Sequence, residues 1–152
     1  MSKIVLASPA PLFDRLLGAG DGSVVESRLD SAGLKMSLGR EISQLFSTKS
    51  RLTLAEFMDS EVTVLDYGVP DFTALSPSAN ADMVLMSEVI AKAHQCFEPR
   101  LSQVGVTLTT DKSSVSSAHA AIIAAVTLSG QALRVDFDLA FSASGALTLQ
   151  PG

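Results

Sequence analysis

The chain of 152 residues has no tryptophan, one tyrosine (Tyr67) and one cysteine (Cys96). Proteins that bind single-stranded nucleic acid stack its bases on aromatic side chains, so the shortage of aromatic residues argues against that function. The net charge of −5 also argues against a surface that binds phosphate groups. A single cysteine cannot form a disulfide within the chain, which is typical of a protein in a reducing compartment.

Long hydrophobic runs are also missing. The apolar run after Lys3 is four residues long, and Pro9 and Pro11 follow soon after it. This run is too short for the apolar region of a secretory signal. No run approaches the ~20 apolar residues that cross a membrane. We therefore expect a cytoplasmic protein without direct membrane insertion. Its length and its 47% of hydrophobic residues predict one domain with a sizeable core.

Lysine and arginine are absent from Leu52 to Ala91, where the chain carries seven acidic residues. These are Glu56, Asp59, Glu61, Asp66, Asp71, Asp82 and Glu88. The simpler interpretation is a solvated acidic face. The alternative is a patch that meets a basic partner, and the sequence leaves both interpretations open.

The first half of the chain predicts three helical segments. Pro11 at a first helical position, followed by leucines up to Gly18, predicts a short amphipathic helix, and residues 18–33 are typical of a loop. A second helix is predicted by apolar residues spaced three and four apart: Leu34, Leu38, Ile42, Leu45 and Phe46. Thr53 and Glu56 match a capping box, which predicts a third, short helical turn.

A short extended piece and then the longest helix are predicted next. The extended piece consists of Val62, Val64 and Leu65. Gly68 and Pro70 prevent its continuation as a regular helix or a central strand. Asn80 is the predicted N-cap of the long helix, and Asp82 favours its N-terminus. Its apolar stripe is Met83, Met86, Ile90, Ala93 and Phe97. Pro99 ends the helix, because the residue before a proline is pushed out of the helical conformation.

The last third of the chain has the alternation of β-strands. Residues 104–110 (VGVTLTT) alternate, and residues 120–128 (AAIIAAVTL) are apolar on both sides, as in a strand covered on both faces or a buried helix. Residues 133–141 (LRVDFDLAF) alternate cleanly, and the turn at 129–132 makes an antiparallel hairpin. Residues 145–150 add a short final strand. Helices followed by a β meander predict an α+β fold, with the helices packed on one face of the sheet.

Metal, nucleophile and phosphate sites find little support in the residues. His94 and Cys96 lie two apart on a helix, so they point to different sides, and His119 is far away in sequence. Cys96 lies beside the apolar stripe, where a structural thiol is the better interpretation than a nucleophile. The glycines of residues 17–23 lack both the spacing and the lysine of a phosphate loop. We therefore expect no cofactor and no metal.

The stretch CFEPRL, residues 96–101, places Pro99 between two opposite charges, Glu98 and Arg100. One interpretation makes Glu98 the general acid of a peptidoglycan hydrolase, paired with Asp66 or Asp71 at about 5 to 9.5 Å. The shortage of aromatic platforms argues against it. A second interpretation is a proline that ends a helix between two solvated charges. The third is a docking handle, whose charged stems are pre-oriented by the rigid proline and therefore lose less entropy on binding.

Two motifs in this order carry a resemblance to a known family. DYGVPDF, residues 66–72, precedes CFEPRL, and a predicted β meander follows. Together they resemble the lysozyme-like baseplate wedge family of contractile phage tails, and within it the TssE family of type VI secretion systems. GREISQLFSTKSR, residues 39–51, is a looser match to a helix of the family. The resemblance spans about residues 11–149, so we expect a flexible N-terminus at 1–10 and a single wedge domain at 11–152.

The resemblance implies a non-enzymatic α+β subunit of the baseplate wedge that lies beneath the contractile sheath. The implied docking motif on the wedge subunits TssF and TssG is Glu98, Pro99 and Arg100. The other motif is expected to hold the shape of a loop through Asp66, Tyr67, Gly68, Pro70, Asp71 and Phe72. TssK and the sheath subunits TssB and TssC are further implied partners, the sheath by pairing with a free strand edge. A phage tail wedge protein and, less favoured, a hydrolase that uses Glu98 are the alternatives.

Overall fold

The computed structural model describes residues 8–9, 28–110, 118–128, 130–141 and 147–150. The helix predicted after Pro11 lies outside these residues. Two short strands, β1 (Ser8–Pro9) and β2 (Arg28–Leu29), pair antiparallel ahead of the first long helix.

Helix α2 spans Ser31–Ser47. It begins before the predicted loop of residues 18–33 ends, because the side chain of Asp30 caps it by accepting a hydrogen bond of 2.8 Å from the backbone N–H of Gly33. The prediction of a loop is therefore wrong for residues 31–33, and also for residues 28–29, which form β2. The apolar stripe is confirmed, since all five of its members are buried: Leu34, Leu38, Ile42, Leu45 and Phe46.

Two short helical elements follow α2. Helix α3 spans Leu54–Asp59 and begins with the predicted capping box. The backbone N–H of Glu56 donates to the hydroxyl of Thr53, and the backbone N–H of Thr53 donates to the carboxylate of Glu56. Residues Val64–Asp66 form the 3₁₀ helix η1, so the extended piece predicted there is wrong. The physical reason is a second capping box: the Thr63 hydroxyl accepts the backbone N–H of Leu65, and Asp66 bonds back to Thr63.

The longest helix, α4, spans Asn80–Phe97. Its N-cap is Ala79 and not the predicted Asn80, which is already the first helical residue and makes no side-chain cap. Asp82 instead reaches back from the first turn and accepts the backbone N–H of Ser76 at 2.8 Å. Of the predicted stripe, Met86, Ile90 and Ala93 are buried, and Met83 and Phe97 are partly buried.

Four antiparallel strands form the sheet, in the order β3-β4-β5-β6. They are β3 (Leu101–Thr110), β4 (Ala118–Leu128), β5 (Gln131–Phe141) and β6 (Leu147–Gln150). Leu128 pairs with Gln131, so a two-residue turn joins β4 to β5, and its second residue, Gly130, has a φ of +82°. This is the hairpin predicted for residues 129–132.

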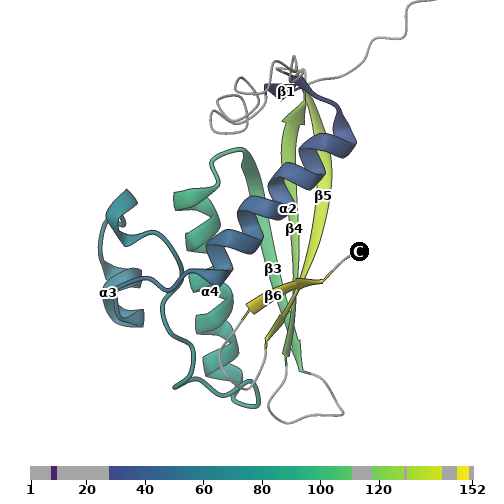
Figure 1. Ribbon diagram of the computed structural model, residues 1–152. Coiled ribbons are helices and arrows are strands. Elements are labelled where there is room, and N and C mark those ends of the chain that lie inside the picture. Colours follow the sequence, from purple (N-terminus) through teal and green to yellow (C-terminus); the bar gives the residue numbers. More distant parts are fainter. Residues whose placement is uncertain (1–7, 10–27, 111–117, 129, 142–146, 151–152) are drawn as a thin grey trace, which may run out of the picture.

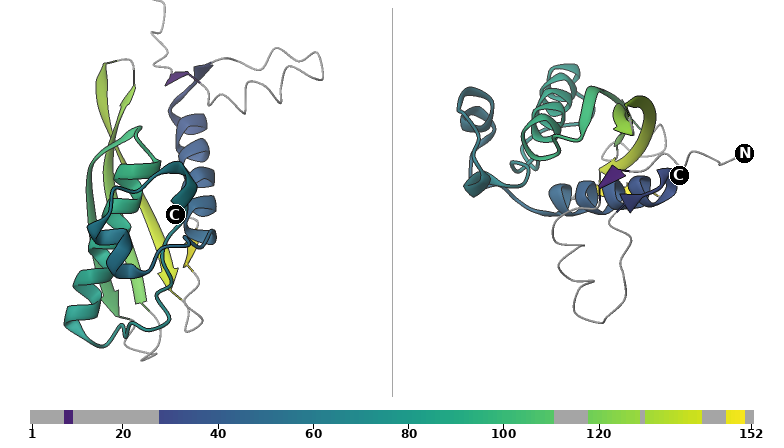
Figure 2. Two further views of the ribbon diagram at one scale, coloured as in Figure 1. Left: turned by 90° about the vertical axis from the view of Figure 1, so that its left-hand side faces the viewer. Right: turned by 90° about the horizontal axis from the view of Figure 1, so that it is seen from above.

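The long helices α2 and α4 lie against one face of the curved sheet, as the three ribbon views show (Figures 1 and 2). The even-numbered residues of β4 face the helices and are buried, from Ala118 through Ile122 to Leu128. The odd-numbered residues are exposed or half-buried, and Ile123 is 42% exposed. The prediction that this strand is covered on both faces is therefore wrong, because helices cover only one face. The predicted α+β architecture is confirmed.

Candidate functional site

The candidate site is built around the turn that joins α4 to β3. The backbone N–H of Glu98 donates to the carbonyl of His94 at 2.9 Å and so closes the last turn of the helix. Pro99 then turns the chain as predicted, and the N–H of Leu101 donates to the carbonyl of Glu98 at 3.0 Å. The side chains of Glu98 and Arg100 are thus presented from a short, hydrogen-bonded junction between helix and strand.

Glu98 and Arg100 bind each other. Arg100 donates through Nε to Oε1 of Glu98 at 2.7 Å and through Nη2 to Oε2 at 2.6 Å. Its Nη1 also donates to the hydroxyl of Ser37 on α2, at 3.2 Å. Glu98 is buried, with 4% of its surface exposed, whereas Pro99 is exposed and the Arg100 side chain is 27% exposed. The motif therefore presents Pro99 and the outer part of Arg100, and Glu98 holds the guanidinium in place.

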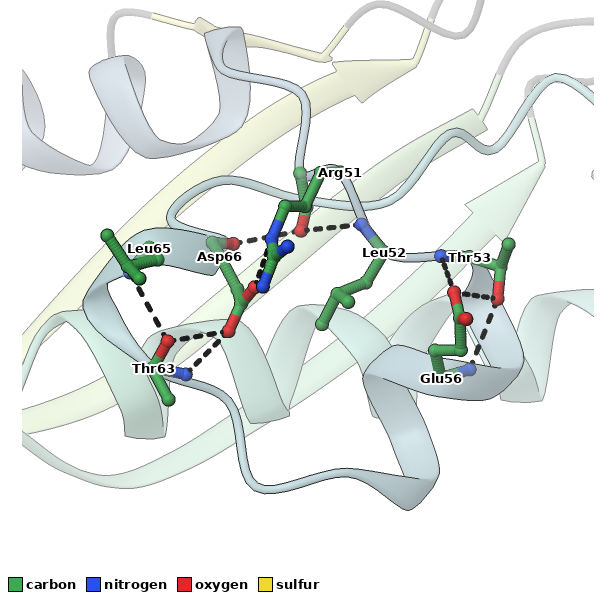
Figure 3. A network of polar contacts seen from close by, with 8 residues as sticks. Arg51, Leu52, Thr53, Glu56, Thr63, Leu65 and Asp66 are labelled. Atoms are coloured by element: carbon green, nitrogen blue, oxygen red, sulfur yellow. Dashed lines mark hydrogen bonds and ion pairs between the residues drawn. The ribbon is translucent and has the colours of Figure 1, made fainter.

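The second motif begins at Asp66, which is buried at the end of η1 (Figure 3). Its carboxylate accepts the backbone N–H and the hydroxyl of Thr63 at 3.0 and 2.7 Å, and Nε of Arg51 at 2.7 Å. The bonds from Thr63, followed by the bond from Arg51, lower the pKa of Asp66. The hydroxyl of Ser50 donates to the Asp66 carbonyl at 2.8 Å. Asp66 therefore ties η1 to the segment that follows α2.

Gly68 lets two stretches of backbone approach closely. Its φ is +117°, and a Cβ at this position would lie 2.5 Å from the carbonyl oxygen of Thr48. This approach allows Val69 to donate to the Thr48 carbonyl at 2.9 Å and to accept from the N–H of Ser50 at 2.8 Å. Only glycine combines this conformation with the available space. Pro70, the next residue, is buried.

The rest of this loop is fixed by side chains. Phe72 is buried in the core. Asp71 accepts from Nζ of Lys49 at 2.9 Å and from the hydroxyl of Thr73 at 2.8 Å, which lowers the pKa of Asp71 to about 2. The DYGVPDF loop is therefore held by contacts to the segment after α2.

Tyr67 joins the two motifs. Its ring packs edge-on against Phe97, the residue before Glu98, with 5.2 Å between the ring centroids. Burial, followed by the negative charges of Glu41 and Glu98, raises the pKa of Tyr67. The loop and the α4–β3 turn are therefore parts of one packed unit.

This geometry does not resemble that of a hydrolase. A general acid must reach its substrate, and glycoside hydrolases use one with a raised pKa. Both carboxylate oxygens of Glu98 are bound by Arg100, and Glu98 itself is buried. The proposed partners, Asp66 and Asp71, have lowered pKa values and are bound by Arg51 and Lys49. The bonds to Asp66 and Asp71 therefore stabilise the charged forms of these two carboxylates, and the carboxylate of Glu98 is occupied by Arg100.

The residues considered for metal or thiol chemistry are dispersed. His94 is fully buried, with Nδ1 2.8 Å from the Ile90 carbonyl and its ring 5.1 Å from that of Phe46. Cys96 is exposed, so its interpretation as a structural thiol is wrong. His119 is exposed on β4. Within the described residues no three or more His, Cys, Asp and Glu side chains are grouped to hold a metal ion.

Two partners of the motifs were missed by sequence reasoning. Ser37 interrupts the apolar stripe of α2 and is buried, and its contact with Arg100 spans 63 positions, which no local pattern reveals. Thr63 and Asp66 have the same spacing as Thr53 and Glu56. A search for this capping pattern would have found the second box and corrected the extended piece.

Comparison with protein-family models gives a match to the family described as baseplate wedge protein gp25, over residues 32–132. Comparisons with curated proteins and with solved structures give no match. No helix in the described part of the chain is long and apolar enough to cross a membrane. The matched range covers most of the chain and contains α2 from its second residue, both motifs and the strands β3 and β4. The chain therefore belongs to the family of baseplate wedge protein gp25, whose members are structural proteins of phage-like baseplates.

Proposed function

We propose that this protein is the TssE-type subunit of a type VI secretion baseplate, a structural subunit without enzymatic activity. It acts as a single wedge domain, residues 11–152, that docks on TssF and TssG, contacts TssK, and anchors the sheath subunits TssB and TssC. In this role it lies in the cytoplasm within a membrane-docked baseplate. The family match, together with the intact CFEPRL and DYGVPDF motifs, is the observation that carries the proposal.

The surface of this protein that docks on the wedge subunits is the turn of Glu98, Pro99 and Arg100. Pro99 fixes the backbone, and the pair of hydrogen bonds from Glu98 orients the planar guanidinium before any partner arrives. Less conformational entropy is then lost on docking. Arg100 and the exposed Pro99 make the contact, and Glu98 positions them. The DYGVPDF loop supports this turn through the packing of Tyr67 on Phe97.

Sheath anchoring uses a free edge of the sheet. In the described chain β3 and β6 are the outer strands of the order β3-β4-β5-β6, so each has one side without a neighbouring strand. Unpaired backbone groups at such an edge accept an incoming strand by β-augmentation. The open face of β4, with Ile123 exposed, is consistent with a sheet that a partner covers in the assembly.

A pull-down with co-expressed TssF and TssG tests the docking proposal. Wild type is expected to be retained, and the Arg100→Ala variant is expected to be lost. Arg134→Ala is the matched control, because Arg134 is an exposed arginine on β5 that also pairs with an acid two residues away, Asp136. Circular dichroism must show that all three proteins are folded. Retention of folded Arg100→Ala at the wild-type level overturns the docking role of this turn.

The second candidate is a wedge protein of a phage tail, which the family description fits equally well. The two candidates share the fold, the motifs and the docking chemistry, so binding assays on this chain alone do not separate them. The neighbouring genes do: TssB, TssC, TssF and TssG genes indicate a secretion system, whereas capsid and tail-tube genes indicate a phage particle.

A further inference from the structure

Two adjacent aliphatic side chains on η1 stand out from the surface. Val64 is 85% exposed and Leu65 is 79% exposed, and these are the highest values among the large hydrophobic residues in the described part of the chain. Met36, the next highest at 70%, is an isolated position on α2. Single exposed hydrophobic residues are common on proteins, but a neighbouring pair with almost no burial needs an explanation.

The turn that carries this pair is held in one conformation (Figure 3). The Thr63 hydroxyl accepts the N–H of Leu65 at 3.3 Å and donates to Asp66 at 2.7 Å. Arg51 holds the other oxygen of the same carboxylate at 2.7 Å. These bonds fix the backbone beneath two side chains that make no part of the core. A rigid display of apolar side chains reduces the entropy lost on binding, which is typical of a docking surface.

The acidic residues that precede the pair in the sequence indicate what kind of partner fits. Asp59 and Glu61, which precede the turn, are exposed. The whole stretch from Leu52 to Ala91 contains no lysine or arginine. Two cationic side chains from outside the stretch form hydrogen bonds to it. Arg51 donates to the carboxylate of Asp66, and Lys92 donates to the carbonyls of Met58 and Ser60 at 2.9 and 3.0 Å.

A second copy of this chain would be a poor occupant, because it carries the same acids and a net charge of −5. We propose that Val64 and Leu65, together with the exposed acids Asp59 and Glu61 that precede them in the sequence, form a docking surface for a protein segment that has an apolar strip flanked by lysine or arginine. We call these four residues the η1 surface. The proposal does not rest on the proposed function, since it requires neither Arg100 nor a particular machine.

The test uses a fluorescent amphipathic peptide of about 18 residues, with leucines on one helical face and lysines on the other. A matched peptide carries glutamate in place of every lysine. Fluorescence anisotropy with the whole chain is expected to show binding of the lysine peptide that weakens with added salt, and much weaker binding of the glutamate peptide. Equal binding of the two peptides, or no binding of the lysine peptide, overturns the proposal.

Variants locate the binding. The double change Val64→Ser with Leu65→Ser is expected to weaken binding of the lysine peptide by about tenfold or more. Glu61→Lys is expected to weaken it about threefold through charge alone. Met36→Ser, which removes an exposed hydrophobic side chain elsewhere, is expected to bind as wild type. Circular dichroism at the assay temperature must show that every variant is folded. Wild-type affinity in the double variant overturns the proposal.

Arg100→Ala separates this proposal from the proposed function. It is expected to bind the peptide like wild type even though it is lost from the complex with TssF and TssG. If the peptide result fails while Arg100→Ala still loses the wedge complex, the η1 surface is wrong and the docking turn stands. If the peptide binds as expected while Arg100→Ala keeps the wedge complex, the η1 surface stands and the docking role of the turn is wrong.

Discussion

Arg100 holds the carboxylate of Glu98 with two hydrogen bonds, at 2.7 and 2.6 Å, although only Pro99 separates the two residues in sequence. The remaining guanidinium nitrogen, Nη1, donates to the hydroxyl of Ser37 on α2 at 3.2 Å. The pair therefore connects the end of α4, the start of β3 and the side of α2. A motif that presents a side chain to a partner is thus also part of the packing of this protein.

The first prediction concerns the stability that this pair provides. Arg100→Ala is expected to lower the free energy of unfolding by about 2 kcal/mol, because it leaves the buried carboxylate of Glu98 without its cation. The loss stays below that of a fully buried pair, since Arg100 is 27% exposed. Urea denaturation measures it. Ser37→Ala is the control, because it removes only the hydrogen bond between Arg100 and Ser37. It is expected to lower the free energy of unfolding by about 1 kcal/mol or less. Equal losses in both variants would contradict the central role of the ion pair.

The second prediction concerns Gly68. Gly68→Ala is expected to destabilise the protein by about 2 to 4 kcal/mol, because the new Cβ would lie 2.5 Å from the Thr48 carbonyl oxygen and the φ of +117° is strained for alanine. Gly130→Ala is the matched control: its φ is +82°, but nothing lies within 4 Å of the added atom, so about 1 kcal/mol is expected. Thermal unfolding compares the two. A similar loss at both positions would show that conformation alone, and not the close approach, makes Gly68 necessary.

Periodicity predicted the core well because apolar spacing records which side of an element is buried. Ile42 and Ile90 lie on stripes found in the sequence, and both are fully buried. The strand β4 shows where this reasoning fails. Its run of alanines between larger residues is apolar on both sides, and so it predicts two covered faces, but alanine is small enough to remain on an open face at little cost.

The site could be predicted only in part. The sequence places Glu98 and Arg100 on either side of a proline, yet it does not show whether two charges at this spacing face solvent or each other. In the structure they bind each other, and Arg100 also bonds Ser37, which the packing of α2 brings to the same place. For Cys96 the sequence showed a neighbouring apolar stripe but not the direction of the side chain. The structure exposes the thiol, although the next residue, Phe97, is partly buried.

The third prediction concerns the ion pair of Lys49 and Asp71. Bonds from Lys49 and Thr73 hold the pKa of Asp71 at about 2, below its ordinary 3.8. The stability from this shift is fully present above pH 3.8 and is lost as the pH falls towards 2. It is expected to be small, since both side chains are about half exposed. In an NMR titration, Lys49→Ala is expected to raise the pKa of Asp71 part of the way back, because the bonds from Thr73 remain. An unchanged pKa would contradict the pairing.

The fourth prediction concerns His94, which α4 buries against Phe46. Burial lowers the pKa of His94, although the bond to the Ile90 carbonyl acts in the opposite direction. The unfolded chain takes up a proton near the ordinary pKa of 6.5 while the folded protein resists it. The stabilisation is therefore present above pH 6.5 and is lost as the pH falls, by up to about 1.4 kcal/mol per pH unit until the folded pKa is reached.

Urea denaturation between pH 7.5 and 5 (roughly the range over which an ordinary histidine titrates) checks this dependence. His94→Phe fills the same ring-shaped space without a titratable group, so it is expected to flatten the decline in stability below pH 6.5. His119→Ala is the matched control, because His119 is exposed on β4 and its removal is expected to leave the decline unchanged. A decline that persists in His94→Phe would assign the pH dependence to other groups. It would also mean that the buried imidazole costs the fold little when it is charged.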